Sequence, residues 1–390
     1  MKEWLIVGGG IHGTYLANLL THQPDLSPEN VGLLDPHDNL LAAWNRMTTN
    51  CGMHYLRSPA THHIDIPILS IYRFAKTPDG QPLADFIPPY NRPALALFRE
   101  HATRVIARNG LARQHIQGRA LTLRKDKPGL IVETTRGPLR TRRVLLAIGM
   151  SEQLCWPAWA RRLRRDGAPI NHVVEPNFQR PAAARAEPTL VVGGGISAVQ
   201  TALTLATGPR ADITLIARRN LQESQFDFNP CWIGPKCLRR FYQEDYDARR
   251  TTIDEARVPG SLPAEVLTAL EQAREASRLG FRQATIQDAV FENDTFRLQT
   301  DTGVLCARQI VLATGFRTER PGGRLVDRLI EDFGLPCNPC GYPIIGADLQ
   351  WGANIYVTGP LAELQIGPCA RNIVGARNAG RMLLASRALK

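Results

Sequence analysis

The chain has 390 residues, of which 44% are hydrophobic and 21% are charged, and its formal net charge is +11. This length allows two or three domains with a large core, and no apolar run is long enough to cross a membrane. The basic clusters are short and lack interleaved aromatic residues, which argues against a nucleic-acid partner.

The first predicted element is an apolar strand over residues 4–7, which ends in the loop Gly8-Gly9-Gly10-Ile11-His12-Gly13. Because the strand begins so early, it leaves no room for a signal peptide, and we expect a cytoplasmic protein. A glycine loop between a strand and a helix lets the backbone approach a pyrophosphate, and the helix N-terminus favours its negative charge. The next strand ends at Asp35, 22 residues after Gly13, where a carboxylate accepts hydrogen bonds from ribose hydroxyls. This unit predicts a site for FAD or NAD, with binding residues Gly8, Gly10, Ile11, His12, Gly13 and Asp35.

The rest of the first unit is less regular. Residues 44–93 predict an irregular stretch, followed by a helix over 94–108 and a strand pair over 120–123 and 130–134. An apolar strand that ends at Gly149 is typical of a return to a parallel sheet. Several prolines between residues 169 and 187 predict a linker.

A second glycine loop follows the apolar residues 190–192. It places Gly193, Gly195, Ser197 and Ala198 at the same strand–turn–helix junction. Here the next strand ends at Arg218-Arg219, and guanidinium groups at that point bind a 2′-phosphate. Two loops in this context predict two cofactors, FAD and NADPH. Two plainer alternatives stay open, since Asp35 also suits a turn before Pro36 and the arginine pair also suits a solvated helix start.

Residues 221–281 predict a helical insertion, with helices over 236–242, 246–256 and 264–277. A closing strand over 309–315, a last strand over 354–359 and a final helix over 370–387 complete the chain. The predicted fold is α/β, with two Rossmann-like dinucleotide-binding domains. The FAD domain is discontinuous (1–175 and 306–390), and it is interrupted by an NADPH domain (186–305) that carries the small helical insertion at 221–281.

Cysteine and histidine spacing gives little sign of a metal. Cys337 and Cys340 form a single CxxC pair in a loop rich in glycine and proline, which favours a structural turn over a redox-active dithiol and lacks the second pair of a zinc site. The adjacent His62 and His63 point to opposite faces if they lie in a strand. We therefore expect no metal site.

At its two loops the chain resembles the two-dinucleotide-binding flavoproteins, and within them the NADPH-dependent flavin monooxygenases. It is more closely similar to the N-hydroxylating monooxygenases that act on ornithine or lysine. The segments that carry the similarity are Trp44 with residues 51–58, Asn91-Arg92-Pro93, residues 226–250, Ala313-Thr314-Gly315 and residues 359–367. The chain departs from the known motifs at two places. Asp227-Phe228-Asn229-Pro230 stands where the N-hydroxylating family has Asn-Glu-x-Phe. Residues 178–181 lack the glycine and the histidine of the FxGxxxH fingerprint of other flavin monooxygenases. The identity of the substrate is therefore not carried over.

The resemblance implies an NADPH-dependent FAD monooxygenase that transfers one oxygen atom from a C4a-peroxyflavin to a small-molecule heteroatom, with N-hydroxylation favoured, or to a ketone. Its partners would be a small-molecule substrate and molecular oxygen, and a homo-oligomer is allowed. The residues implied for the catalytic pocket are Trp44, Met53, His54, Arg57, Arg92, Asp227, Asn229 and Gln365. The resemblance implies that the cofactors also contact Gly149, Thr314, Gly315, Gly359 and Gly367. Structural alternatives stay open for Trp44 as core, His54 as a buried histidine and Asp227 as a helix cap.

Two rival functions stay open as well. An NADPH–flavin reductase would pass electrons to a disulfide, quinone or other acceptor, in one version through Cys337 and Cys340. A non-catalytic flavoprotein scaffold or redox sensor is the second rival. The strand end at Arg218-Arg219 argues against the scaffold, because a protein without turnover has no need to select NADPH.

Overall fold

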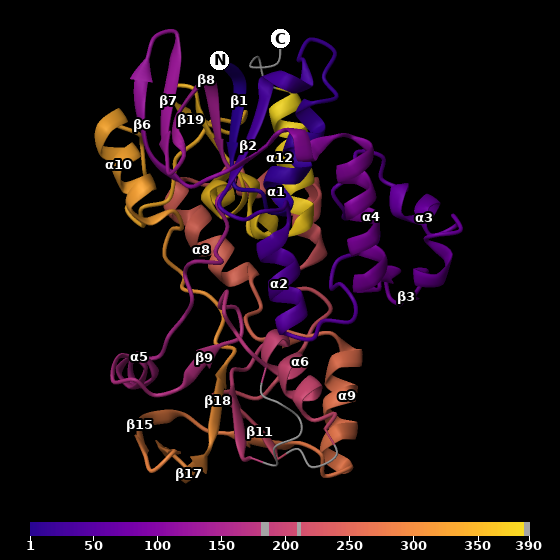
Figure 1. Ribbon diagram of the computed structural model, residues 1–390, viewed down its shortest axis with the longest axis vertical. Coiled ribbons are helices and arrows are strands. Elements are labelled where there is room, and N and C mark those ends of the chain that lie inside the picture. The colour runs from indigo at the N-terminus through magenta and orange to yellow at the C-terminus, as the bar shows by residue number, and fades with distance from the viewer. Residues whose placement is uncertain (181–186, 209–211, 386–390) are drawn as a thin grey trace.

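Two sheets, the first mixed and the second parallel, form the framework of the protein (Figure 1). The structure, a computed structural model, describes residues 1–180, 187–208 and 212–385. The first sheet has the order β19-β20-β8-β1-β2-β5, and β7 joins β6 to β8. Its strands are β1 (Lys2–Val7), β2 (Val31–Asp35), β5 (His115–Gln117), β6 (Ala120–Asp126), β7 (Gly129–Thr134), β8 (Gly137–Leu146), β19 (Gln350–Gly352) and β20 (Ile355–Val357).

The second sheet is wholly parallel and has the order β14-β11-β10-β18-β9. Its strands are β9 (Ile170–His172), β10 (Thr189–Val192), β11 (Ile213–Ala217), β14 (Gly280–Gln283) and β18 (Gln309–Leu312). The central strands of both sheets are buried and apolar, as expected when helices cover both faces of a parallel sheet.

Three small sheets lie outside this framework. They are the pair β3 (Phe86–Ile87) and β4 (Arg92–Pro93), the pair β12 (Gln222–Glu223) and β13 (Ser261–Leu262), and the antiparallel trio β15 (Ile286–Glu292), β16 (Thr295–Thr300) and β17 (Gly303–Ala307).

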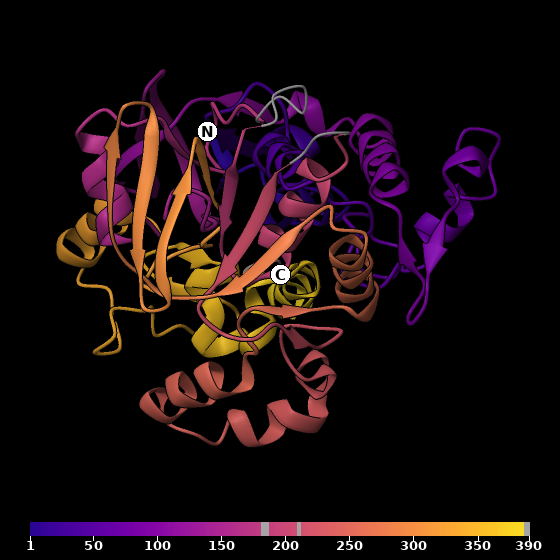
Figure 2. The ribbon, with the colours of Figure 1, turned by 90° about the horizontal axis from the view of Figure 1, so that it is seen from below.

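The helices divide between the two sheets. Those of the first sheet and its connections are α1 (Ile11–Leu20), α2 (Ala42–Asn50), α3 (Ser70–Phe74), α4 (Leu95–Arg108), α10 (Gly323–Phe333), α11 (Glu363–Ile366) and α12 (Ile373–Leu384). Those of the second sheet are α5 (Ala158–Arg165), α6 (Ile196–Leu205) and α9 (Ala264–Glu275). The insertion helices α7 (Pro235–Phe241) and α8 (Tyr246–Ala256) lie beside the C-terminal segment, below it in Figure 2. None of the helices in the described part of the chain has the length and apolar character needed to cross a bilayer.

Two segments cross side by side between the sheets. Leu154 forms a bridge with Phe316, the amide of Arg317 donates to the carbonyl of Gln153 at 2.8 Å, and the hydroxyl of Thr314 donates to the carbonyl of Cys155. The outward and return crossings therefore brace each other, which restricts how the two sheets move relative to one another.

Three sequence expectations need correction. Residues 44–50 are not irregular but lie in α2, whose C-terminal end reaches α6; the buried Cys51 belongs to the core of the second sheet. Strands β9 and β18 lie in the second sheet, although the predicted boundaries of 175 and 306 assigned them to the FAD domain. Helix α9 packs on α6 and leads into β14, so it belongs to the second sheet rather than to the insertion. In each case contacts distant in sequence override the local pattern.

The expected linker over 169–187 holds β9 at its start, and residues 181–186 lie outside the described part of the chain. The expected final helix is observed as α12, which begins three residues later than predicted and ends at Leu384; residues 386 and 387 also lie outside the described part.

Candidate cofactor and substrate site

The first glycine loop lies between the C-terminal end of β1 and the start of α1. A Cβ on Gly13 would lie 1.7 Å from the carbonyl oxygen of Gly8, so the helix packs on the loop more closely than any side chain allows. A Cβ on Gly10 would meet nothing within 4 Å, and no side chain caps the first turn of α1. The loop is thus tight against the protein and open on its outer side, which fits a pyrophosphate held on the free N–H groups of the helix.

Asp35, at the end of β2, fastens this loop to the sheet. Its Oδ2 accepts a hydrogen bond from the amide of Gly9 at 2.6 Å, and its Oδ1 accepts one from the amide of His37 at 2.9 Å. The carboxylate therefore holds the loop backbone in place. The expected contact with ribose hydroxyls stays a prediction, and each carboxylate oxygen keeps acceptor capacity for it.

His12 joins the loop to the C-terminal part of the chain. Its Nε2 donates to the carbonyl of Asn372 at 3.1 Å, so its Nδ1 accepts from the hydroxyl of Thr358 at 2.9 Å. Burial lowers the pKa of His12 to about 4, against the opposing effect of the Asn372 hydrogen bond, and the ring is neutral at physiological pH. A Cβ on Gly359 would lie 3.7 Å from the imidazole ring. His12 is therefore a positioning residue that sets the C-terminal segment against the loop.

The second glycine loop repeats this geometry between β10 and α6. A Cβ on Gly193 would lie 2.3 Å from the carbonyl oxygen of Ala313, whereas one on Gly195 would approach only the Cα of Gly260, at 3.8 Å. Ser197 and Ala198 lie in the first turn of α6. This loop is again closed toward the sheet and open outward, as a second pyrophosphate requires.

Arg218 and Arg219 follow β11 and are exposed. Neither side chain makes a hydrogen bond or ion pair with another residue of the described ranges. Both guanidinium groups are therefore available to a phosphate at the edge of the second sheet.

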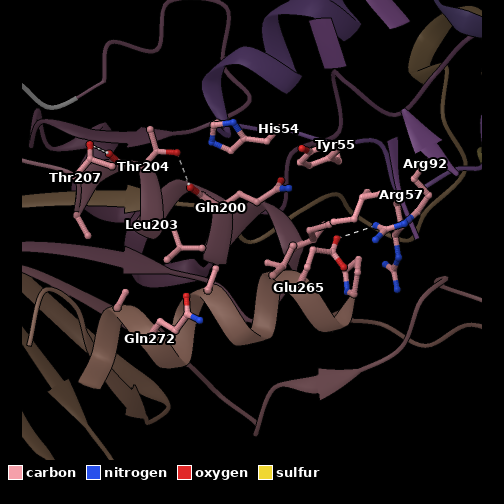
Figure 3. Close-up of a pocket in the computed structure, with 18 of the residues that line it drawn as sticks. His54, Tyr55, Arg57, Arg92, Gln200, Leu203, Thr204, Thr207, Glu265 and Gln272 are labelled. Carbon is pink, nitrogen blue, oxygen red and sulfur yellow. Dashed lines mark hydrogen bonds and ion pairs between the residues drawn. The ribbon is translucent and has the colours of Figure 1, made fainter. Parts of the chain in front are cut away.

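A cavity of about 560 Å³ lies between α6, α9 and two segments of the first unit, residues 52–57 and 87–92 (Figure 3). We call it the α6–α9 cavity. Three of the predicted pocket residues line it: His54, Arg57 and Arg92. His54 is exposed, which rules out the alternative that it is a buried histidine.

The two arginines of this cavity are engaged in different ways. Arg57 donates to the carbonyls of Gln225 and Ser224 at 2.8 and 2.7 Å and to the hydroxyl of Ser261 at 2.7 Å. This guanidinium ties the first unit to β12 and β13. Arg92 is completely buried, donates to Oε1 of Glu265 at 2.7 Å, and leaves its Nε without a partner among the described residues.

The other predicted catalytic residues lie elsewhere. Trp44 packs on Phe98 with ring centroids 4.9 Å apart, and Met53 packs on the first core. Their places in a catalytic pocket stay predictions. Oδ1 of Asp227 accepts from the side-chain Nδ2 of Asn372 at 3.2 Å. Asp227 does not cap the helix near Lys236, because the residue before the first turn of α7 is Gly234. Asn229 is exposed and accepts from the amide of Cys231 at 2.9 Å.

Gln365 is held by the insertion. Arg249, buried in α8, donates to Oε1 of Gln365 at 3.2 Å and to the carbonyl of Leu364 at 3.0 Å. The guanidinium of Arg249 also lies 4.9 Å from the ring centroid of Tyr246, within cation–π range. The insertion thus fixes the orientation of Gln365 and α11.

A buried carboxylate anchors the same segment. Glu363 is 1% exposed and pairs with Arg371 at 2.8 Å and with Arg250 of α8. Burial acts to raise the pKa of Glu363, but the hydrogen bonds and charges of Arg371 and Arg250 outweigh it and hold the pKa below its usual range. The carboxylate is therefore ionised and ties α8 to α11.

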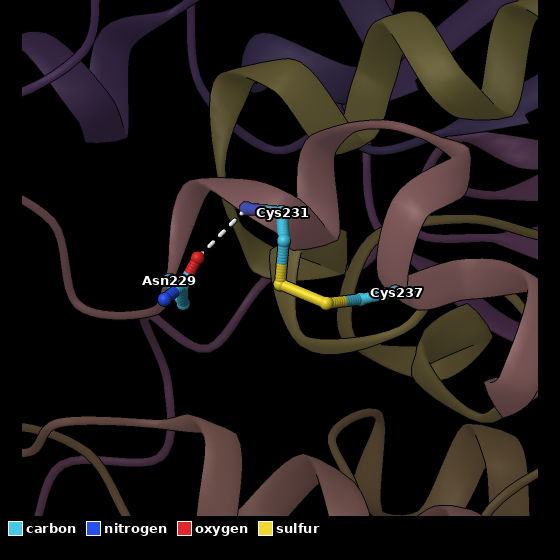
Figure 4. The surroundings of a disulfide bond; sticks show 3 residues. All are labelled: Asn229, Cys231 and Cys237. Carbon is cyan, nitrogen blue, oxygen red and sulfur yellow. Dashed lines mark hydrogen bonds between the residues drawn. A yellow bond between two sulfur atoms is a disulfide. The ribbon is translucent and has the colours of Figure 1, made fainter.

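The CxxC pair lies in a turn, as the sequence predicts, and the disulfide of the described residues lies elsewhere. Cys337 and Cys340 are not bonded to each other, and the amide of Cys340 donates to Oδ1 of Asn338 at 2.8 Å within a turn. A disulfide instead joins Cys231 to Cys237 and links the start of α7 to the turn before it (Figure 4). Within residues 1–180, 187–208 and 212–385, no group of three His, Cys, Asp or Glu side chains is arranged to hold a metal ion.

Some predicted cofactor residues have structural partners of their own. Gly315 has φ +76° and accepts from the amide of Cys155 at 2.9 Å, within the crossing between the sheets. Gly367 has φ +87°, and a Cβ there would lie 3.1 Å from the side chain of Leu238 in α7. The lack of a side chain at Gly367 therefore lets α7 pack closely on this segment. Gly149 follows β8 and faces open space. Their contacts with a cofactor stay predictions.

Several site residues were not found from the sequence. Gln200 and Glu265 sit on helices and look like surface residues in the sequence, whereas Arg249 lies in a segment, 226–250, that the resemblance marked without giving it a role. Glu363 lies in a segment that the resemblance did mark, and its position between two glycines with positive φ was the one available signal.

Two protein-family models match the chain. The model of the FAD-NAD(P)-binding family matches residues 5–151. The model of the L-lysine 6-monooxygenase/L-ornithine 5-monooxygenase family matches residues 119–318, just over half of the chain. None of the curated protein sequences gives a match.

Several solved structures are similar over the whole chain. One is the FAD-bound cadaverine monooxygenase of the desferrioxamine biosynthetic pathway from Erwinia amylovora, with a TM-score of 0.77 and 13% identity over 100% of this chain and 94% of that one. The reduced form of ornithine hydroxylase from Pseudomonas aeruginosa has a TM-score of 0.75 and 18% identity over 100% of both chains. The ornithine N-hydroxylase from Kutzneria sp. 744, solved with reduced FAD, NADP+ and L-ornithine, has a TM-score of 0.76 and 15% identity over 99% of this chain and 98% of that one. At these identities the likeness concerns the fold, and it confirms the predicted α/β class.

Proposed function

Since the chain belongs to the L-lysine 6-monooxygenase/L-ornithine 5-monooxygenase family and is an FAD- and NADPH-dependent N-hydroxylating monooxygenase, we propose that it transfers one oxygen atom to the primary amine nitrogen of a small molecule. The observation that carries this proposal is the pair of open glycine loops, each at the C-terminal end of a central parallel strand. Two such cradles suit an enzyme that holds its oxidant-forming cofactor and its reductant at the same time.

The two sheets divide the cofactors between them in this proposal. The first sheet would hold FAD through the loop that begins at Gly8, and the second would hold NADPH through the loop that begins at Gly193. The boundaries that we propose follow the strands and α5: residues 158–312 form the NADPH unit, and the segments before and after it form the FAD unit.

When bound, the flavin supplies the redox and oxygen-transfer chemistry. The protein residues have the remaining tasks. His12 and Asp35 hold the loop, Arg249 orients Gln365, and the ion pairs of Glu363 keep α11 packed against α8. We propose that this closely packed C-terminal segment excludes water from the reacting nitrogen, which must be neutral to be nucleophilic.

The direct test uses the purified FAD-loaded enzyme with NADPH, 18O-labelled oxygen and separate amines, namely L-lysine, L-ornithine and cadaverine. We expect at least one amine to accelerate NADPH oxidation and to yield a hydroxylamine that contains one labelled oxygen, measured by mass spectrometry. A reaction without amine measures the hydrogen peroxide formed by uncoupled turnover. If every amine tested gives peroxide alone, the proposed N-hydroxylation of these amines is wrong and the reductase alternative gains weight.

Arg218 and Arg219 provide a test of cofactor choice. We expect an Arg218→Ser/Arg219→Ser variant to raise KM for NADPH by about tenfold or more, because each charge-assisted hydrogen bond to the 2′-phosphate contributes about 1.5–3 kcal/mol. KM for NADH, which lacks that phosphate, is expected to stay within about twofold. Steady-state kinetics with both nucleotides measure the ratio, and Arg161→Ser, an exposed arginine of α5, is the control. An equal loss with NADH would contradict the assignment.

A further inference from the structure

The α6–α9 cavity is separate from both nucleotide loops. Its lining includes Ile196 but none of the loop glycines Gly8, Gly10, Gly193 and Gly195. Neither Asp35 nor the arginine pair after β11 takes part in it. The cavity runs along α9, on the side where α6 faces residues 54 and 55 (Figure 3). Its volume of about 560 Å³ is in the range of small-molecule sites.

The two long walls of the cavity are apolar. Helix α6 contributes Leu203, and α9 contributes Val266, Ala269 and Ala273. Ile87 closes the side that belongs to the first unit. Such walls favour a hydrocarbon chain or ring and offer few partners to a strongly polar molecule.

One end of the cavity carries a buried arginine with one unpaired donor. Arg92 is completely buried and binds Glu265, yet its Nε has no hydrogen-bond partner among the described residues. Buried donors without partners are rare, and each calls for an explanation such as a bound group. Gln200, on α6, also lines the cavity, and its buried Oε1 has no partner in the described ranges.

The charges of the lining favour an anion. Arg57, Arg92 and Arg278 line the cavity, and Glu265 is the single carboxylate among the lining residues. A carboxylate that enters at the Arg92 end would be attracted by this excess of positive charge, and an apolar body would extend between α6 and α9.

We propose that the α6–α9 cavity binds a small amphiphilic carboxylate, with its charged group at Arg92 and its apolar body between α6 and α9. Because the walls come from both units, occupancy would strengthen the contact between them. The lining contains none of the residues of the C-terminal segment around Gln365, and the proposal does not depend on the proposed N-hydroxylation.

The test measures the binding of decanoate to the FAD-loaded enzyme by isothermal titration calorimetry. We expect decanoate to bind saturably. Decan-1-ol, which has the same chain without the charge, should bind at least tenfold more weakly. Ala269→Phe fills the cavity and is expected to weaken decanoate binding at least tenfold. Thr268→Phe, an exposed neighbour on the same helix that does not line the cavity, is the matched control and should leave binding unchanged.

Flavin content and thermal melting report whether each variant folds. If Ala269→Phe fails to fold, Leu203→Phe fills the cavity from α6 instead. The absence of decanoate binding, equal binding of decan-1-ol, or unchanged binding in the filled variants would each overturn the proposal. Competition between decanoate and NADPH would also overturn it, because it would assign the anion to the nucleotide site.

Discussion

A Gly13→Ala variant is expected to emerge from purification without flavin and with reduced stability. The added Cβ would lie 1.7 Å from the carbonyl oxygen of Gly8, so either the loop or α1 must shift. Forcing extra atoms into so tight a contact costs about 3 kcal/mol. The ratio of flavin to protein absorbance and a denaturant melt of the FAD-free protein measure the two effects.

Gly10→Ala is the matched control in the same loop. Its Cβ would meet nothing within 4 Å, so the fold should keep its stability while the added methyl group obstructs the pyrophosphate. We therefore expect Gly10→Ala to weaken FAD binding without lowering the melting temperature of the FAD-free protein. A Gly13→Ala protein with normal flavin content and stability would contradict the role given to the loop.

Glu363→Gln is expected to lower the free energy of unfolding by about 3 kcal/mol, the usual cost of removing one partner of a buried ion pair. Glu363 is 1% exposed, and its loss leaves Arg371 and Arg250 facing each other without a carboxylate between them. Asp254→Asn is the matched control, since Asp254 also pairs with Arg250 but is 68% exposed. We expect that control to change the free energy of unfolding by less than about 1 kcal/mol. Equal effects of the two substitutions would contradict the role of Glu363 in holding α11 against α8.

The same residue predicts a pH dependence. The pKa of Glu363 is lowered in the folded protein from its ordinary value of 4.5, because Arg371 and Arg250 outweigh the effect of burial. A carboxyl group of this kind contributes stability that is present above pH 4.5 and is lost as the pH falls through the folded pKa. Below pH 4.5 the wild-type protein should therefore lose more stability than Glu363→Gln, and urea melts across that range measure the difference.

Local patterns were enough to predict both nucleotide units. Each depends on a strand, a glycine turn and a helix that follow one another directly, so the residues from Gly8 to Asp35 carry the whole signal. The residue at the end of the next strand, Asp35 in one unit and Arg218 in the other, also distinguishes the two predicted cofactors without reference to the rest of the fold. The helices α7 and α8 were predicted for the same reason, since their apolar spacing is local.

Contacts between distant residues could not be predicted in this way. Arg92 and Glu265 are 173 positions apart, and neither sequence neighbourhood identifies the other. Helix α2 was missed because its asparagine and threonine residues are weak helix formers, and its packing against α6 decides its structure. The disulfide was missed because the spacing of Cys231 and Cys237 matches no familiar motif, and the two cysteines meet only through the turn before α7.

Because β20 lies near the end of the sequence, the first sheet receives its last strands after the second sheet has all of its own. The central β8 of the first sheet pairs with β20 (Ile355–Val357), and His12 binds Thr358 and the carbonyl of Asn372. The second sheet, by contrast, needs no residue beyond Leu312 for its strands. During synthesis the nascent chain therefore supplies all the strands of the second sheet while the older first sheet still lacks an edge. The contacts of His12 with Thr358 and Asn372 can therefore form only after the strands of the second sheet have been synthesised.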